Sequence, residues 1–251
     1  LFALGWRGSN RQWRHYEMGY LLLAALSTPL VLSVHSVVSF DFATSVIPGW
    51  HTTIFPPYFV AGAIHSGLAM VLTLMIPIRK LFHYEKIITL EVLESVAKTI
   101  IFTGLIVGFA YATEFFMAWY SQNPVEMAIF KYRPTGDYAL GFWIMVVCNT
   151  IIPLLFFFKR IRTTIFWLFG ISIFVNIGMW YERFVIIISS VSRDFIPHAW
   201  GLYSPTIIEF GIMLGAFCLF FFFFLLFVKH LPSVSMTEMK ETVDQGAGHG
   251  D

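Results

Sequence analysis

The sequence predicts an all-α fold, a polytopic transmembrane helical bundle with six spans. Hydrophobic residues make up 57% of the chain and charged residues only 12%, whereas a soluble domain carries about 25% charged residues. Six stretches are apolar over roughly the 20 residues that a helix needs to cross a hydrocarbon core of about 30 Å. The mean hydropathy of +0.73 agrees with these spans. The chain is therefore expected to lie in a membrane.

The predicted spans, in chain order, cover residues 16–42, 57–78, 87–120, 138–158, 164–191 and 205–228. The third is long enough to tilt or to protrude from the membrane. Residues 1–230 would thus form a transmembrane helical domain, and the polar residues 231–251 a cytoplasmic tail. Because the chain does not begin with Met, we expect it to be the C-terminal part of a longer protein.

The distribution of Lys and Arg predicts the orientation, because cytoplasmic loops carry an excess of these residues. One side of the predicted membrane holds eleven of them, and the other side holds three in loops, Lys131, Arg133 and Arg193. Both termini are therefore predicted to be cytoplasmic. The eleven are Arg7, Arg11, Arg14, Arg79, Lys80, Lys86, Lys159, Arg160, Arg162, Lys229 and Lys240.

Several functional classes have no support in the sequence. A net charge of +1 offers no electrostatic argument for nucleic acid. Cys148 and Cys218 lie inside apolar runs and form no metal-binding or iron–sulfur spacing. The chain also contains no phosphate-binding loop and no dinucleotide fingerprint. If the protein carries out redox chemistry, its electron acceptor is expected in a partner subunit.

Ionisable residues inside spans are costly, and they indicate functional sites by default. Seven of them fall in the predicted outer half of the membrane, which suggests one polar site or two neighbouring ones. Structural roles are the alternative for six of them. Two near helix ends could cap those ends, an adjacent Glu and Arg could form an ion pair, and the two histidines could form hydrogen bonds between helices. The seven are His35, Asp41, His65, Glu114, Glu182, Arg183 and Glu209.

The inner side offers the beginning of a proton pathway or, as the alternative, a structural ion pair. Glu94 and Lys98 are four residues apart, in the order that favours pairing on a helix. Glu114 lies 16 residues further along the same span, about 24 Å at the helical rise. Together with Glu209, these residues are the candidates for proton conduction.

Quinol oxidation needs an aromatic slot open to lipid, a His or carboxylate that accepts the hydroxyl proton, and a redox centre nearby. His35 and Asp41, with the aromatic residues around them, meet the first two needs. Two alternatives remain open: a haem-b protein that uses His35 and His65 as axial ligands, and a secondary transporter. Because the chain has one such His pair and no Cys pattern, we predict neither haem nor metal in it.

Two stretches carry a resemblance to a known family: HSVVSFDFATSVIPGWHTTIFPPYFVAGAIHSG at 35–67 and NIGMWYERFVIIISSVSRDF at 176–195, with LPSVSMTEMKE at 231–241 in agreement. The chain resembles the NrfD/PsrC membrane subunits, most closely the ActC subunits of bacterial alternative complex III, with the paralogous ActF subunits as the alternative. The resemblance implies two four-helix bundles with flanking helices, of which this chain would supply the second, and no haem.

The resemblance also implies a function. Menaquinol or another quinol would be oxidised near the outer face of the bacterial inner membrane. Its electrons would pass to iron–sulfur clusters in an extracytoplasmic partner protein, and c-type cytochrome subunits and a paralogous membrane subunit would complete the complex. Asp41 matches an acidic site position of the family, and Arg183 a basic one, so we expect both, with His35, to be catalytic and His65 and Glu182 to line the quinol site. Proton translocation would use Glu94, Lys98 and Glu114. The ActF alternative would conduct protons or anchor the complex without binding quinol.

Overall fold

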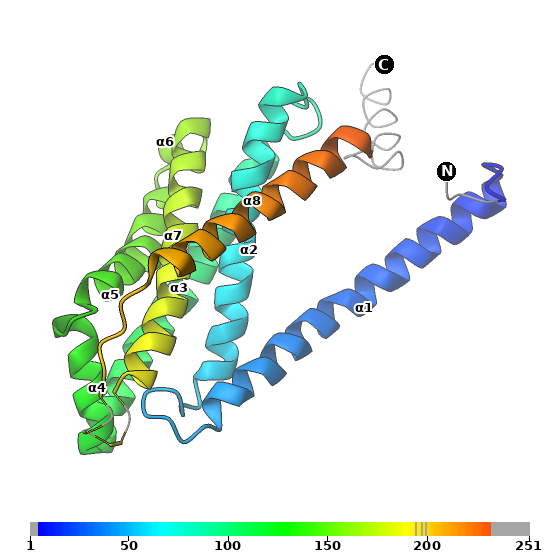
Figure 1. The fold of residues 1–251 in the computed structure, drawn as a ribbon. Coiled ribbons are helices and arrows are strands. Elements are labelled where there is room, and N and C mark those ends of the chain that lie inside the picture. Colours follow the sequence, from blue (N-terminus) through cyan, green and yellow to red (C-terminus); the bar gives the residue numbers. More distant parts are fainter. Residues whose placement is uncertain (1–4, 194, 197, 199, 232–251) are drawn as a thin grey trace.

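A computed structural model describes residues 5–193, 195, 196, 198 and 200–231, and within these residues the regular structure is helical throughout (Figure 1). Six helical segments are long and apolar enough to cross a membrane. The predicted fold class is thereby confirmed. The predicted tail and the stretch 231–241 lie, apart from Leu231, outside the described residues.

The helices are close to the predicted spans, and capping residues explain several of the differences. α1 begins at Asn10 because Ser9 and Gln12 form a capping box, and α3 begins at Leu90 because the Thr89 side chain caps it. The bounds are α1 Asn10–Ala43, α2 Phe55–Leu81, α3 Leu90–Ser121, α4 Pro124–Thr135, α5 Ala139–Val146, η1 Val147–Ile151, η2 Ile152–Phe157, α6 Lys159–Arg162, α7 Ile165–Val191 and α8 Ile207–His230.

Four spans form a bundle: α2, α3, the continuous segment α5–η1–η2, and α7 (Figure 1). We call its two ends the α4 end and the α6 end, after the short helices that lie there. Leu72, Ile100 and Leu168 belong to a buried cluster in the half towards the α6 end. Tyr58 and Phe142 belong to a second cluster towards the α4 end. Burial of these side chains holds the four helices together.

The fourth span changes its helical type in the middle. Residues Val147–Ile151 form a π-helical turn, and a 3-10 turn that contains Pro153 follows. Proline lacks the N–H that a regular helix would use, and π turns widen a helix locally. The turn carries Asn149 into the bundle, against Gly178 of α7, where an added Cβ would lie 2.2 Å from Asn149 Oδ1. A glycine at 178 is therefore needed for this close approach.

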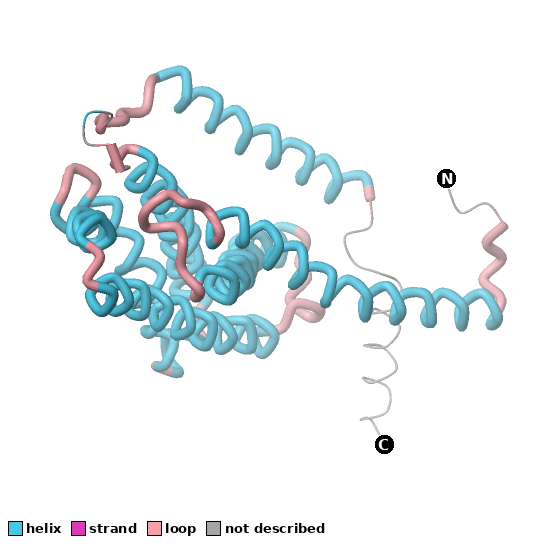
Figure 2. Tube along the Cα trace, turned by 90° about the horizontal axis from the view of Figure 1, so that it is seen from below, coloured by secondary structure: helices cyan, strands magenta, loops and turns pink. Residues whose placement is uncertain are grey.

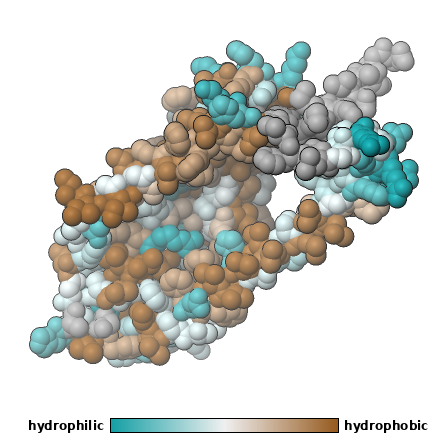
Figure 3. All heavy atoms as spheres, turned by 45° about the vertical axis from the view of Figure 1, so that its right-hand side comes forward, coloured by the Kyte–Doolittle hydropathy of each residue, from teal (hydrophilic) through white to brown (hydrophobic). Residues whose placement is uncertain are grey.

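α1 and α8 flank the bundle rather than join it. Both leave its outline as separate arms (Figure 2), and α1 is anchored where the Phe42 ring stacks on Phe55 and Phe59. Hydrophobic side chains cover much of the two helices on the face seen in Figure 3. Such a surface is suited to lipid, which agrees with the span assignment.

Candidate functional site

The α4 end of the bundle buries two carboxylates and an arginine. Glu114 of α3 is 5% exposed, Glu182 of α7 is fully buried, and Arg133 of α4 is 4% exposed. Removing charged groups from water costs several kcal/mol each unless partners compensate them. The partners of these three side chains therefore define the site.

Glu182 is held mainly through one of its two oxygens. Tyr111 of α3 donates its hydroxyl to Oε2, and Asn149 Nδ2 donates to the same oxygen at 3.2 Å and to Tyr111 Oη at 3.0 Å. Among the described residues, Oε1 accepts no hydrogen bond, although Arg183 Nη1 lies 3.7 Å away. Three helices thus meet at this carboxylate, and one of its oxygens remains available to a further donor.

Arg183 connects this carboxylate to the flank where α1 is anchored. Its guanidinium carbon lies 4.2 Å from the centroid of the Phe59 ring, in a cation–π contact. The centroid of the same ring lies 6.0 Å from that of Phe42, near the end of α1. Phe59 therefore lies between Arg183 and the segment of α1 that contains Asp41.

Arg133 joins α4 to the carboxylate on α3. Its Nη1 lies 3.8 Å from Glu114 Oε2. Its other nitrogens donate to Ser189 Oγ at 3.3 Å, Ser190 Oγ at 3.3 Å and the Gly49 carbonyl at 3.1 Å. Burial lowers the pKa of Arg133, and the negative charge of Glu114 opposes this shift.

The loop between α1 and α2 closes over Arg133. Gly49 has φ +82°, and an added Cβ would lie 2.9 Å from both Arg133 Nη2 and Ser190 Oγ. Its N–H donates to the Glu126 carboxylate at 3.1 Å, which also lies 3.3 Å from His51 Nε2. Only glycine fits at position 49, because the backbone there is in the left-handed region and Arg133 occupies the space that a side chain would need.

A small cavity of about 10 Å³ lies beside Glu114. Tyr58, Tyr111, Glu114 and Arg133 line it, together with apolar residues. Glu114 Oε1 is buried and accepts no hydrogen bond from any described residue. The volume is about that of a single water-sized sphere.

Of the residues that the sequence analysis placed in the outer half, the structure brings Glu114, Glu182 and Arg183 together. His65 is also buried, but it forms its hydrogen bond with Thr103 Oγ1 at 2.9 Å and not with the carboxylates. His35 is half-buried on the flanking α1 and donates to its own helix, at Val31 O, at 2.8 Å. Asp41 is exposed on the same helix. The predicted group is thus divided: Glu114, Glu182 and Arg183 lie at the α4 end, His65 bonds elsewhere in the bundle, and His35 and Asp41 lie on the flanking α1.

The remaining candidates have contacts that fit structural roles. Glu94 Oε1 lies 3.1 Å from Lys98 Nζ and accepts from Arg162 Nε at 2.8 Å, at the α6 end. Glu209 completes a capping box with Thr206 at the start of α8. These contacts agree with the pairing and capping alternatives, and they do not link either residue to Glu114.

Sequence reasoning missed several members of the cluster: Tyr58, Glu126, Arg133 and Asn149. Arg133 was counted as a water-facing loop cation, and its burial corrects that assignment. Two signals were present. Glu126 and Arg133 are seven residues apart and share one face of a short helix, and Asn149 is a polar residue within an apolar span. Tyr58 had no such signal.

Comparison with protein-family models matches residues 8–193 to the family described as "Polysulphide reductase, NrfD". The match covers α1 to α7, and so it contains every residue of the buried cluster. No curated protein matches the chain.

Proposed function

This chain belongs to the NrfD family of polysulphide reductase membrane proteins, and on that basis we propose that it is the quinol-handling membrane subunit of a respiratory complex, of the ActC type found in alternative complex III. The family comprises membrane subunits of quinol-linked redox complexes, which partner with iron–sulfur proteins. In our proposal the electrons of the quinol leave to an extracytoplasmic iron–sulfur subunit. The α4 end faces outward in the bacterial inner membrane, and both termini are cytoplasmic.

The quinol site of this proposal lies where α1 meets α2 and α7. His35 and Phe42 are seven residues apart, so they share a face of α1, and Phe42 packs on Phe59, over which Arg183 lies. This arrangement supports a slot with aromatic walls, an acidic group at Asp41 and a cation at Arg183. Asp41 or His35 would accept the hydroxyl proton as the quinol is oxidised.

The observation that carries the proposal furthest is the pair of buried carboxylates, Glu114 and Glu182. Neither is fully hydrogen-bonded within the described residues, and Tyr58 and Tyr111 line a cavity beside Glu114. A water molecule there would connect Glu114 to the tyrosine hydroxyls, and Tyr111 already donates to Glu182. We propose that this chain of groups moves protons at the α4 end, with Arg133 compensating the charge of Glu114.

Turnover of the purified complex tests the proposal. Asp41→Asn and Arg183→Gln should each lower quinol oxidation while the complex assembles normally. Glu85→Gln, in the loop at the α6 end, is the matched control and should leave turnover unchanged. Turnover at the wild-type rate in both site variants would show that Asp41 and Arg183 take no part in quinol oxidation.

One alternative function has specific support. The cluster is complete without His35 and Asp41, which is the arrangement expected of an ActF-type subunit that conducts protons without binding quinol. In that case Glu114→Gln would lower proton transfer, and Asp41→Asn would change nothing. The haem-b alternative has a separate test, because a b-type absorbance that is lost in a His65→Ala variant would support it.

A further inference from the structure

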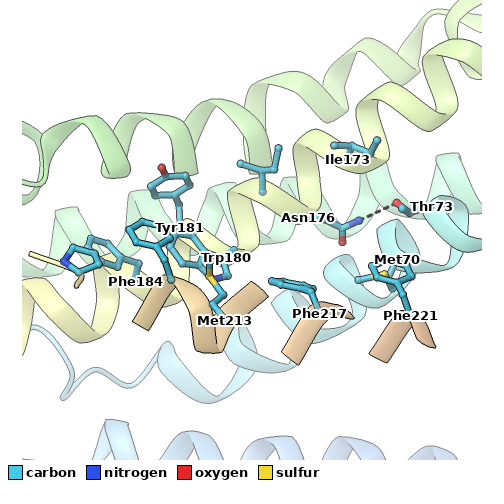
Figure 4. Close-up of a pocket in the computed structure, with 13 residues that line it drawn as sticks. Met70, Thr73, Ile173, Asn176, Trp180, Tyr181, Phe184, Met213, Phe217 and Phe221 are labelled. Carbon is cyan, nitrogen blue, oxygen red and sulfur yellow. Dashed lines mark hydrogen bonds between the residues drawn. The ribbon is translucent and has the colours of Figure 1, made fainter. Parts of the chain in front are cut away.

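An apolar groove lies outside the bundle, between α7 and α8, and residues of α2 close one side of it (Figure 4). Its volume is about 550 Å³, within the range of pockets that bind small organic ligands. Trp180 and Phe184 of α7 line it together with Met213, Phe217 and Phe221 of α8. The groove is separate from the cluster at Glu114 and Glu182 and from the flank at Asp41.

The groove contains a polar group held in a defined orientation. Asn176 Nδ2 donates to Thr73 Oγ1 at 2.9 Å, and that hydroxyl is itself held by Ala69 O at 2.9 Å and Ser172 Oγ at 3.0 Å. The amide oxygen of Asn176 is turned towards α8 in Figure 4, whereas the Tyr181 hydroxyl points away from the groove. None of the described residues donates a hydrogen bond to this amide oxygen.

The depth of Asn176 restricts what can bind. It is the twelfth of the 27 residues of α7, so it lies near the middle of the membrane if α7 spans it. An acceptor without a donor is unfavourable in an apolar medium, which favours a ligand with a hydroxyl or N–H group. A charged head group at this depth would be costly. The ligand should therefore be neutral.

The shape of the groove indicates a ring with an apolar tail. The α8 residues that line it, Phe210, Met213, Phe217 and Phe221, recur at helical spacing and form a stripe about 16 Å long. Trp180 and Phe217 provide flat aromatic faces beside Asn176. A planar ring would stack there, and a chain of isoprenoid units would follow the stripe towards Phe221.

A phospholipid fits the other end of the groove poorly. A smaller hollow of about 160 Å³ adjoins the groove and shares Trp180, Pro205 and Met213 with it. Tyr203 and Glu209 also line this hollow. The Glu209 carboxylate would repel a phosphate placed there. We infer that the groove binds a prenylated hydroquinone whose ring hydroxyl donates to Asn176 Oδ1. This inference rests on the proposed function for the identity of the ligand, but it concerns a second site.

Photolabelling of the complex in nanodiscs tests the inference. The probe is a photoreactive, reduced naphthoquinone with four isoprenoid units, in phosphatidylethanolamine–phosphatidylglycerol nanodiscs, and the labelled peptides are mapped. In the wild type the α7 and α8 peptides should be labelled, and unlabelled quinol should compete. Asn176→Leu removes the acceptor but leaves Thr73 its bonds to Ala69 and Ser172, so the apparent Kd should rise about five- to tenfold.

Two substitutions of equal size separate filling of the groove from general damage. Met213→Trp fills the groove and should abolish labelling of α7 and α8. Leu214→Trp adds the same ring at the next residue, which is 64% exposed and does not line the groove, so it should leave labelling unchanged. Equal labelling in the wild type and in both the Asn176→Leu and Met213→Trp variants would overturn the inference.

The remaining outcomes are equally decisive. If a photoreactive phosphatidylethanolamine labels the same peptides and quinol does not displace it, the groove holds phospholipid and the inference is wrong. If labelling of α7 and α8 fails while Asp41→Asn still lowers turnover, the inference fails and the proposed function stands. If labelling follows the pattern above and turnover is insensitive to Asp41→Asn, the quinol site in the groove is supported and the quinol site at Asp41 is rejected.

Discussion

The two ends of the bundle use the same kinds of charged residue in different surroundings. At the α4 end, Arg133 meets Glu114 where both side chains are almost fully buried. At the α6 end, Glu94 meets Lys98 and Arg162, and the Lys98 side chain is 56% exposed. An exposed pair contributes little because water and salt screen it, whereas a buried charge without its partner is strongly destabilising. The comparison indicates that the α4 end is where a change of charge has consequences.

The largest expected effect comes from breaking the buried pair. Arg133→Met would leave Glu114 without its cation and should destabilise the fold by about 3–5 kcal/mol. Thermal unfolding of the purified protein in one detergent measures this change. The double variant Arg133→Met with Glu114→Gln should recover part of the loss. A single variant as stable as the wild type would show that the pair is not what holds α4 in place.

Next in size is the expected effect of Asp41→Asn on turnover. Removing a positioned general base typically lowers a rate by about 100-fold or more, and the amide keeps the shape of the carboxylate. Steady-state quinol oxidation by the complex measures it, with subunit yield as the control for assembly. A wild-type rate with normal yield would show that Asp41 is not part of the quinol site.

The loop over Arg133 should show an intermediate effect. Gly49→Ala introduces a Cβ within 2.9 Å of Arg133 Nη2 at φ +82°, and such strain costs about 1–3 kcal/mol. Gly67→Ala is the matched control, because an added Cβ there meets nothing within 4 Å. If both alanine variants unfold at the same temperature, the loop must adjust without disturbing the arginine.

Proton release should depend on the buried carboxylate of α3 and not on an exposed one of the same helix. Glu114→Gln should lower the number of protons released per electron more than it lowers quinol oxidation, because it removes a buried carboxylate beside the tyrosine-lined cavity. Glu91→Gln, an exposed carboxylate in the first turn of the same helix, should change neither quantity. Reconstituted complexes with unchanged ratios would reduce Glu114 to a structural partner of Arg133.

The smallest effect is expected at the α6 end. Glu94→Gln removes the contacts to Lys98 and Arg162, and it should shift the unfolding temperature only slightly and leave proton release intact. Parallel measurements of both quantities are the check. A selective loss of proton uptake would instead make Glu94 part of an entry route, as the conduction hypothesis for this residue requires.

The six spans follow from the sequence alone. Their signal is local: each helix satisfies its own backbone hydrogen bonds, and the thickness of the bilayer sets how many apolar residues are needed. The same reasoning identified Glu114, Glu182 and Arg183 as embedded groups, because charged residues stand out in apolar runs.

Which of these residues meet depends on how the helices pack in three dimensions. Arg133 reaches Glu114 because α4 folds back beneath the bundle, and Asn149 reaches Glu182 because a π turn redirects it. His35 and Asp41 lie apart from the buried cluster because α1 flanks the bundle. Such contacts depend on how helices rotate and pack against distant segments. Local hydropathy carries no information on that packing, since lipid and a neighbouring helix are equally apolar.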